Sequence, residues 1–140
     1  MIKGLVVGAA ALVLASPAWA FRTPAPEGAR VYIVSPEIGA TVSNPVTVIF
    51  GLEGMGVAPA GVEQERTGHH HLIIDVEPSE VDMSAPLPAD DQHLHFGGGQ
   101  TQMTRELPSG THRVWLLLGD HNHIPHDPPI MSEIVTITVE

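Results

Sequence analysis

The chain has 140 residues and carries sixteen carboxylates against six lysines and arginines, so its formal net charge is −10 with neutral histidines. Such an acidic surface repels phosphate backbones and anionic lipid, which argues against nucleic-acid and membrane-surface binding, and it attracts cations. The sequence contains no cysteine, which excludes disulfides, thiolate metal ligands and cysteine nucleophiles.

The first twenty residues have the form of a cleaved export signal. Lys3 precedes an apolar run of about a dozen residues, and Ala18-Trp19-Ala20 has the small-x-small form of a signal-peptidase site. The run is shorter than the roughly 20 apolar residues of a membrane-spanning helix, although an uncleaved anchor is the alternative. We therefore expect a signal peptide at residues 1–20 and a periplasmic or secreted mature chain with five arginines, no lysine and a net charge of −11.

The mature chain is expected to hold an N-terminal tether at residues 21–29 and one domain at residues 30–140. The tether is rich in proline and glycine and has no apolar periodicity. In the domain, segments rich in β-forming residues alternate with turn residues, which predicts strands. These segments are residues 30–34, 46–52, 69–76, 93–96, 100–107, 111–119 and 134–139.

Long loops are expected between these strands, at residues 53–67, 77–91 and 120–129, where glycine or proline is frequent. No helix of three turns can be drawn without crossing one of these two residue types. About seven short strands separated by turns are typical of an immunoglobulin-like antiparallel β-sandwich. A β-barrel with the same strands is the alternative topology.

Eight of the nine histidines lie in three short stretches, at residues 69–71, 93–95 and 121–126. In an extended strand, residues two apart project to the same side. His69 and His71 therefore share a face, with His70 on the opposite one, and His93 shares a face with His95. Imidazole nitrogen is a ligand that copper, zinc and nickel bind well.

If the fold brings the three stretches together, they form a site for one divalent transition metal, copper or zinc. The candidate ligands, the first four preferred, are His71, His95, His123, His126, His69 and His93. Asp120 and Asp127 flank the third stretch and are candidates to orient the imidazoles by accepting hydrogen bonds from them. Because only neutral imidazole coordinates a metal, binding is expected to weaken below about pH 6.

The remaining histidine and the methionines are expected to be structural. His112 stands alone at the start of a predicted strand, beside Arg113. The methionines of the mature chain show no Met-x-Met or Met-x-x-Met spacing, so core or loop filling is the better interpretation than a thioether site for Cu(I).

Two other functions stay open. In one, the protein is a structural or interaction module, with another periplasmic protein as its partner, and its histidines hold the long loops by hydrogen bonds. In the other, it is a metal-dependent enzyme, since three protein ligands and a water suffice for a catalytic zinc. The sequence favours a non-catalytic role, because no serine stands in a nucleophile context and no helical His-Glu-x-x-His occurs.

Three motifs carry a resemblance to a known family: Gly-His-His-His-Leu-Ile at 68–73, His-Leu-His-Phe-Gly-Gly-Gly-Gln-Thr at 93–101, and Gly-Asp-His-Asn-His-Ile-Pro-His-Asp-Pro-Pro at 119–129. In this order they resemble a family of short exported bacterial domains of unknown function, over nearly all of the mature chain. The resemblance implies an exported domain with no established activity and no ligand set to transfer. It makes His123 and His126 more typical of the family than His121, so His121 ranks lower.

Overall fold

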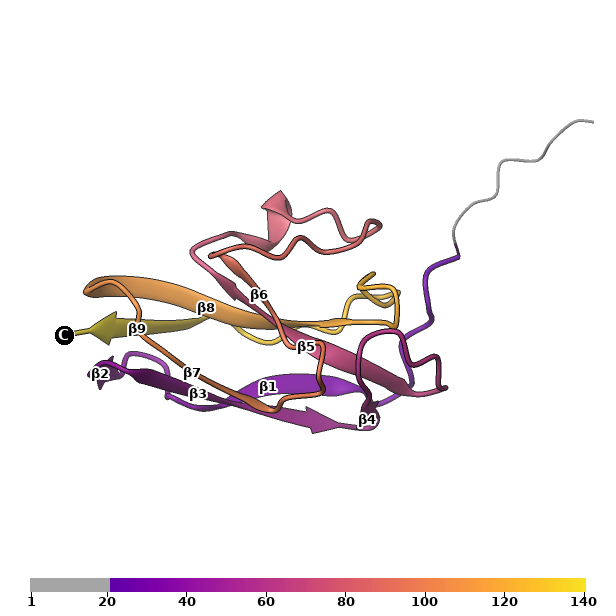
Figure 1. Ribbon diagram of the computed structural model, residues 1–140, viewed down its shortest axis with the longest axis horizontal. Helices are drawn as coiled ribbons and strands as arrows, with labels where there is room; N and C mark the ends of the chain where they lie inside the picture. Colours follow the sequence, from indigo (N-terminus) through magenta and orange to yellow (C-terminus); the bar gives the residue numbers. More distant parts are fainter. Residues whose placement is uncertain (1–20) are drawn as a thin grey trace, which may run out of the picture.

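The computed structural model describes residues 21–140, so the signal peptide expected at 1–20 lies outside the described residues. The domain is a sandwich of two β-sheets (Figure 1). Its elements are β1 (Arg30–Ser35), β2 (Thr41–Val42), β3 (Val46–Glu53), β4 (Gly56–Val57), β5 (Thr67–Ile74), the 3₁₀ turn η1 (Pro78–Glu80), β6 (His93–His95), β7 (Gln102–Arg105), β8 (Gly110–Gly119) and β9 (Val135–Val139). The all-β prediction is confirmed, with seven strands of three or more residues and the two-residue strands β2 and β4. Within the described range, no helix has the length and apolar character needed to cross a membrane.

The two sheets divide the strands as an immunoglobulin-like sandwich does. One sheet has the order β1-β3-β7, and the other has the order β2-β9-β8-β5-β4 with β6 also paired to β5. Pairing is antiparallel except that β2 runs parallel to β9 and β4 parallel to β5. Two separate sheets, with β5, β8 and β9 together in one of them, match the predicted sandwich rather than the barrel.

Strand alternation builds the core between the sheets. Val46, Val48 and Phe50 of β3 are buried there, and the residues between them are exposed. From the larger sheet, Leu72 and Ile74 of β5 face them in the same core. Each fully buried side chain of this kind contributes about 1.5–3 kcal/mol to folding relative to an exposed one.

A second, smaller apolar cluster covers the outer face of the larger sheet, the face turned away from β1, β3 and β7. Ile73 of β5 packs there with Trp115 and Leu117 of β8, and Leu87 of the loop after β5 covers them. The Trp115 Nε1 atom donates to the Val76 carbonyl at 2.8 Å, which ties the start of that loop to the sheet. β5 is therefore buried on both faces.

His112, at the start of β8, connects two turns at one end of the sandwich. Its Nδ1 lies 2.7 Å from Asp75 Oδ2 and its Nε2 lies 2.7 Å from the Pro108 carbonyl oxygen. An ionised carboxylate and a carbonyl only accept hydrogen bonds, so the protonated ring, in which both nitrogens donate, is the form that satisfies both contacts. Burial acts to lower the pKa of His112, but the bonds to Asp75 and Pro108 outweigh it and raise that pKa.

We expect the His112→Ala substitution to cost more stability in acid than in base. A raised pKa in the folded protein means that the stabilisation is fully present below the unfolded value of 6.5 and is lost as pH rises through the folded pKa. Urea unfolding of both proteins should give a difference in the free energy of unfolding that is larger by about 0.5–1 kcal/mol at about pH 5.5 than at about pH 9. The substitution leaves the other titrating groups in place, so their contributions cancel when the two proteins are compared at one pH. If His112→Ala lowered the free energy of unfolding equally at both pH values, the prediction would be contradicted.

Candidate metal centre

The three consecutive histidines of β5 point to opposite faces of the larger sheet, as their spacing predicted. His70 points between the sheets, where its ring lies 5.1 Å from that of Phe50. His69 and His71 project from the outer face, on the same side as Ile73. All three histidines are at most 1% exposed.

Strand pairing and one loop bring the other two stretches to this face. His95 of β6 lies directly opposite His71 of β5, with 5.1 Å between the ring centroids. The loop after β8 brings the ring of His123 to 5.0 Å from that of His69 and 4.6 Å from that of His95. One ligand atom from each of these four side chains lies within 4.8 Å of the other three. We call these four residues the histidine group.

The nitrogen atoms of the histidine group contact one another directly. His69 Nε2 lies 3.0 Å from His71 Nε2 and 3.2 Å from His123 Nδ1. Two nitrogens bound to one zinc ion at about 2.0–2.1 Å lie at most about 4.2 Å apart. The separations of 3.0 and 3.2 Å therefore allow these pairs to share one ion, whereas a separation as long as 4.8 Å would have to shorten.

Hydrogen bonding alone does not satisfy these rings. The Nδ1 atoms of His69 and His71 are buried and have no hydrogen-bond partner. A neutral imidazole has one N–H and one lone pair. One N–H can form the hydrogen bond between the Nε2 atoms of His69 and His71. The N–H of the ring that accepts this bond must then be at its buried Nδ1. Such an unpaired buried donor costs about 1–3 kcal/mol.

Burial keeps the imidazoles in the form that coordinates metals. It lowers the pKa of His69 to about 4 and the pKa of His71 to about 2, and the neighbouring imidazoles add to both shifts. Burial, followed by the influence of His123, also lowers the pKa of His95. These three rings are therefore neutral at neutral pH.

Two glycines make room for the rings of the histidine group. A Cβ atom at Gly97 would lie 2.6 Å from His95 Nε2, and one at Gly119 would lie 2.8 Å from His71 Nε2. Both distances are too short for real contacts, so a side chain at either position would displace an imidazole. In the sequence, the run of three glycines after β6 was the only sign that the imidazoles need this space.

Asp120 shapes the turn that carries His123. Its Oδ1 accepts the backbone N–H groups of Asn122 at 2.8 Å and Ile124 at 3.1 Å, and its Oδ2 accepts the Thr23 hydroxyl at 2.7 Å. Burial alone would raise the pKa of Asp120, but these hydrogen bonds lower it, and the carboxylate stays ionised. Asp120 therefore acts on the backbone of the loop, where His123 adopts a φ of 65° that few side chains tolerate.

Residues 22–25, which the sequence assigned to a tether, lie against the same loop. The Arg22 side chain donates to the Pro125 and His126 carbonyls and pairs with Asp127 at 3.4 Å. Backbone hydrogen bonds of 2.9 Å connect this segment to Asp127 on both sides. The N-terminal segment therefore helps to hold the loop of His123, a role that its proline-rich sequence did not reveal.

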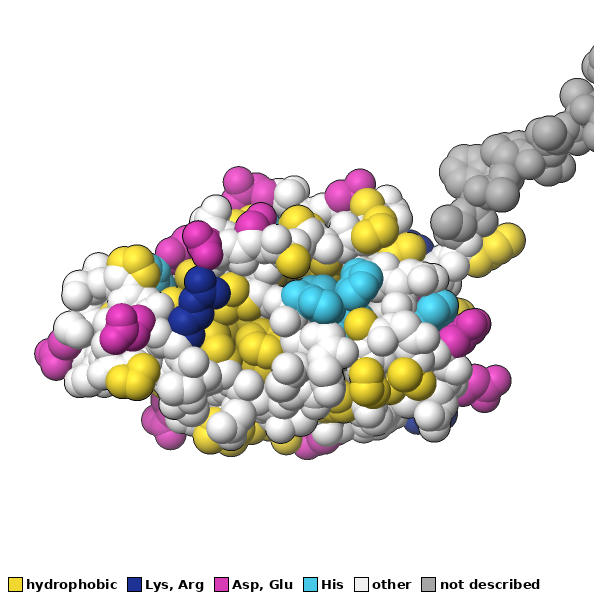
Figure 2. Space-filling view, in the orientation of Figure 1, with side chains coloured by type: hydrophobic (Ala, Val, Ile, Leu, Met, Phe, Trp, Pro, Cys, Tyr) yellow, Lys and Arg dark blue, Asp and Glu magenta, His cyan; other side chains and the backbone are white. Residues whose placement is uncertain are grey.

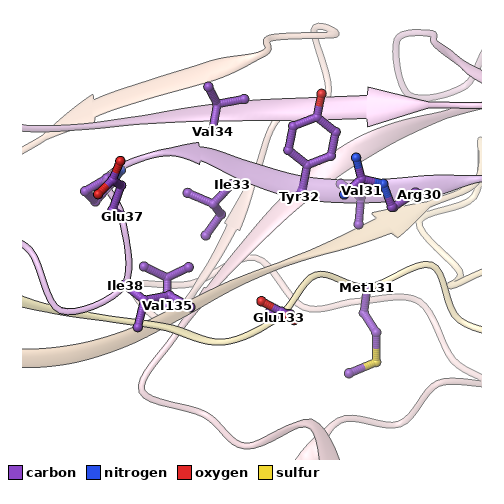
Figure 3. A pocket seen from close by; sticks show the side chains of 11 residues that line it. Arg30, Val31, Tyr32, Ile33, Val34, Glu37, Ile38, Met131, Glu133 and Val135 are labelled. Atoms are coloured by element: carbon purple, nitrogen blue, oxygen red, sulfur yellow. The ribbon is translucent and has the colours of Figure 1, made fainter.

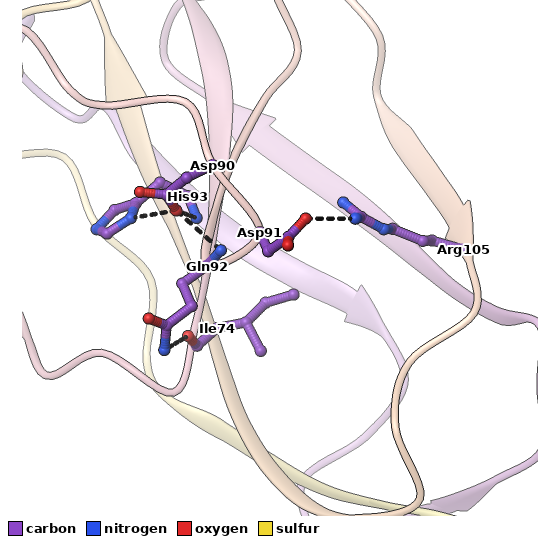
Figure 4. A network of polar contacts seen from close by, with 6 residues as sticks. All are labelled: Ile74, Asp90, Asp91, Gln92, His93 and Arg105. Atoms are coloured by element: carbon purple, nitrogen blue, oxygen red, sulfur yellow. Dashed lines mark hydrogen bonds and ion pairs between the residues drawn. The ribbon is translucent and has the colours of Figure 1, made fainter.

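The other two candidate ligands lie outside the histidine group. The His126 ring is 1% exposed and packs against Gly68, where a Cβ atom would lie 3.1 Å from its Cε1. His93 Nδ1 donates a hydrogen bond of 2.9 Å to Asp90 Oδ1 (Figure 4). His69, an alternate in the sequence ranking, takes the place in the group that was expected for His126.

A groove of about 650 Å³ elsewhere on the domain contains no histidine. It lies between β1 and the segment before β9, and its lining includes Val34, Ile38 and Met131 (Figure 3). Imidazole side chains therefore gather at the histidine group and not in this groove.

The matched family segment contains the complete histidine group. The model of the family described as a domain of unknown function, DUF4399, matches residues 48–140. Comparison with curated proteins gave no match, and comparison with solved structures gave none. The resemblance to a family of domains of unknown function is confirmed at that level: the chain belongs to the DUF4399 family.

Proposed function

We propose that this protein binds one divalent transition metal ion, copper or zinc, through His69, His71, His95 and His123. The observation that carries the proposal is the approach of four imidazoles, from two strands and a loop, to within 4.8 Å of one another. Residues far apart in the sequence rarely bring four polar rings to one point of a sheet face without a common partner, because buried polar groups need one.

The chemistry of the donors supports copper or zinc among the metals. The histidine group offers only neutral nitrogen ligands, with no carboxylate, thiolate or thioether. Magnesium and calcium prefer oxygen ligands, whereas imidazole suits Zn(II), Cu(II) and Ni(II). We further propose that the ion is bound after export, in the periplasm or outside the cell, on the basis of the export-signal pattern of residues 1–20.

A purely structural role for the histidine group has less support. Such a role requires imidazoles that bond to carboxylates and backbone, as His112 does with Asp75 and Pro108. In the histidine group, the Nε2 atoms of His69 and His71 lie against other imidazoles and not against a carboxylate or a backbone group, which is the arrangement expected around a shared ion. We therefore favour metal binding or handling as the function.

Calorimetry of the mature, untagged protein with Cu(II) and Zn(II) tests the proposal. We expect one ion per chain, and the His71→Ala variant should lose about 100-fold in affinity, equivalent to about 2.7 kcal/mol. His121→Ala, which removes an imidazole of the same loop outside the histidine group, is the matched control and should bind as the wild type does.

Thermal unfolding separates the metal-binding role from the structural one. A metal bound only by the folded state raises the melting temperature of the wild type and not that of His71→Ala. The proposed function would be refuted by a metal affinity of the wild type no better than that of a peptide with scattered histidines. It would also be refuted if His71→Ala lowered the melting temperature equally with metal and with chelator.

Substitution of neighbouring glycines tests the geometry without removal of a ligand. Gly97→Ala places a methyl group 2.6 Å from His95 Nε2, whereas Gly98→Ala meets only the flexible side chain of Gln100, at 3.0 Å and beyond. Both changes remove a glycine from the same loop, so their effects on the unfolded chain are similar. We expect Gly97→Ala to weaken metal binding by about tenfold or more. Equal affinities for the two variants would show that His95 does not coordinate the ion.

The pH dependence of metal affinity should start at lower pH than the sequence suggested. Protons compete with the ion only where they bind the metal-free site, and burial lowers the pKa of His69 to about 4 and of His71 to about 2. Zinc affinity measured at constant ionic strength should therefore fall less steeply between about pH 6.5 and pH 5 than four ordinary imidazoles would require, and should steepen toward about pH 4 as His69 takes up a proton. A loss of about ten-thousandfold for each pH unit below about pH 6, which is the slope for four protons that compete with one ion, would contradict the burial of His69 and His71.

A further inference from the structure

The histidine group is buried on one side and open to solvent on the other. His69 and His71 of β5 are at most 1% exposed, whereas His95 is exposed and His123 is partly exposed. Figure 2 shows that some histidine side chains reach the surface of the domain. An ion held by the group would therefore lie at the surface end of the site and not in a closed cavity.

The four donors approach the ion from a limited range of directions. His69, His71 and His95 all rise from the outer face of one sheet, because β5 and β6 are paired with His71 opposite His95. His123 comes from the loop after β8, on the other side of β5. Among residues 21–140, no further histidine, cysteine or carboxylate side chain joins the group from the exposed side above β6.

There is room for a ligand next to this exposed side. A groove of about 500 Å³ along β6 includes His95 in its lining, together with Leu94, Phe96 and Met103, and contains no other member of the histidine group. Arg105 also lines the groove, but Asp91 pairs with it at 3.0 Å, as Figure 4 shows. Small molecules from solvent can therefore approach His95, the exposed member of the group.

The ligands themselves do not neutralise the ion. Four neutral imidazoles leave a divalent ion with both of its positive charges in its coordination shell. The ionised Asp120 acts electrostatically on His69 and offsets part of this charge, but it is engaged with Thr23 and with the backbone of its own loop and is not a ligand. Because one side of the site is buried, an uncompensated charge there is costly, and an anion on the open side would reduce that cost.

We infer that the bound ion keeps one coordination position on its solvent side, and that this position takes a small anion such as hydroxide, a halide or azide. The inference rests on the proposed function, because the position exists only when an ion is bound. The exchange is a simple substitution, in which the anion donates a lone pair to the ion as a coordinated water leaves, and nothing is oxidised or reduced. The site would then have four protein ligands and one exchangeable position. An exchangeable position is typical of catalytic metal sites and is absent from structural ones.

Azide is a suitable probe, since it forms a charge-transfer absorption band when it binds Cu(II). The mature protein, loaded with one equivalent of Cu(II), is titrated with sodium azide, and absorption and electron paramagnetic resonance spectra are recorded. We expect a new band that saturates, with copper still bound to the protein after gel filtration. His121→Ala, which removes an imidazole outside the histidine group, should give the same titration.

The charge argument is tested by His95→Glu, which adds a carboxylate where the exposed imidazole stands. With one positive charge neutralised by the protein, azide should bind the copper-loaded variant at least about tenfold more weakly than the wild type. Azide binding as tight as in the wild type would overturn the charge argument.

The outcomes distinguish this inference from the proposed function. Absence of specific copper binding overturns both. Copper bound through nitrogen ligands with no spectral response to azide overturns the inference alone and leaves a closed four-ligand site. Removal of copper from the protein by azide also overturns the inference alone, because the anion would then compete with the imidazoles and not join them.

Discussion

The register of β5 between its neighbours β6 and β8 is the constraint on which the site depends. His71 stands opposite His95 on one side and Leu117 on the other. A slip of one residue would turn every side chain of β5 to the opposite face, and the imidazoles would enter the core. Leu72 and Ile74, which are 0% and 5% exposed between the sheets, oppose such a slip. The alternation that builds the hydrophobic core therefore also directs the imidazoles outward.

The buried imidazoles cost stability, and the surrounding structure offsets that cost. Unpaired nitrogens on His69 and His71 are each unfavourable by about 1–3 kcal/mol where they carry a proton. The small apolar cluster under the loop after β5 contributes burial beside them, and its Leu87 donates a backbone hydrogen bond of 2.9 Å to the His123 carbonyl. The cluster that stabilises the outer face therefore also helps to position the loop of His123. A bound ion would be coordinated by the Nε2 lone pairs, and the Nδ1 atoms would then carry the protons.

Strands and loops contribute differently to the histidine group. Regular pairing is enough to place His71 opposite His95, but His123 needs a turn with an unusual φ, three hydrogen bonds to Asp120 and the support of residues 22–25. The segment matched by the DUF4399 family begins at residue 48, so it includes the four imidazoles but not this N-terminal support. The four imidazoles and the N-terminal segment that supports the loop of His123 therefore come from different parts of the chain.

Local sequence patterns predicted the seven longer strands, the β-sandwich class of fold and the faces of the β5 histidines, because alternation along a strand is a local property. The two-residue strands β2 and β4 were not predicted, and β4 lies in an expected loop. The membership of the histidine group depends on the three-dimensional structure. His126 is three residues from His123, yet its ring packs against Gly68, and His93 is held by Asp90 although it shares a strand with His95. Which imidazoles converge depends on strand partners and on loop conformations set by residues as distant as Thr23 and Asp120, 97 positions apart. No local pattern encodes such contacts, so only the tertiary structure selects the four.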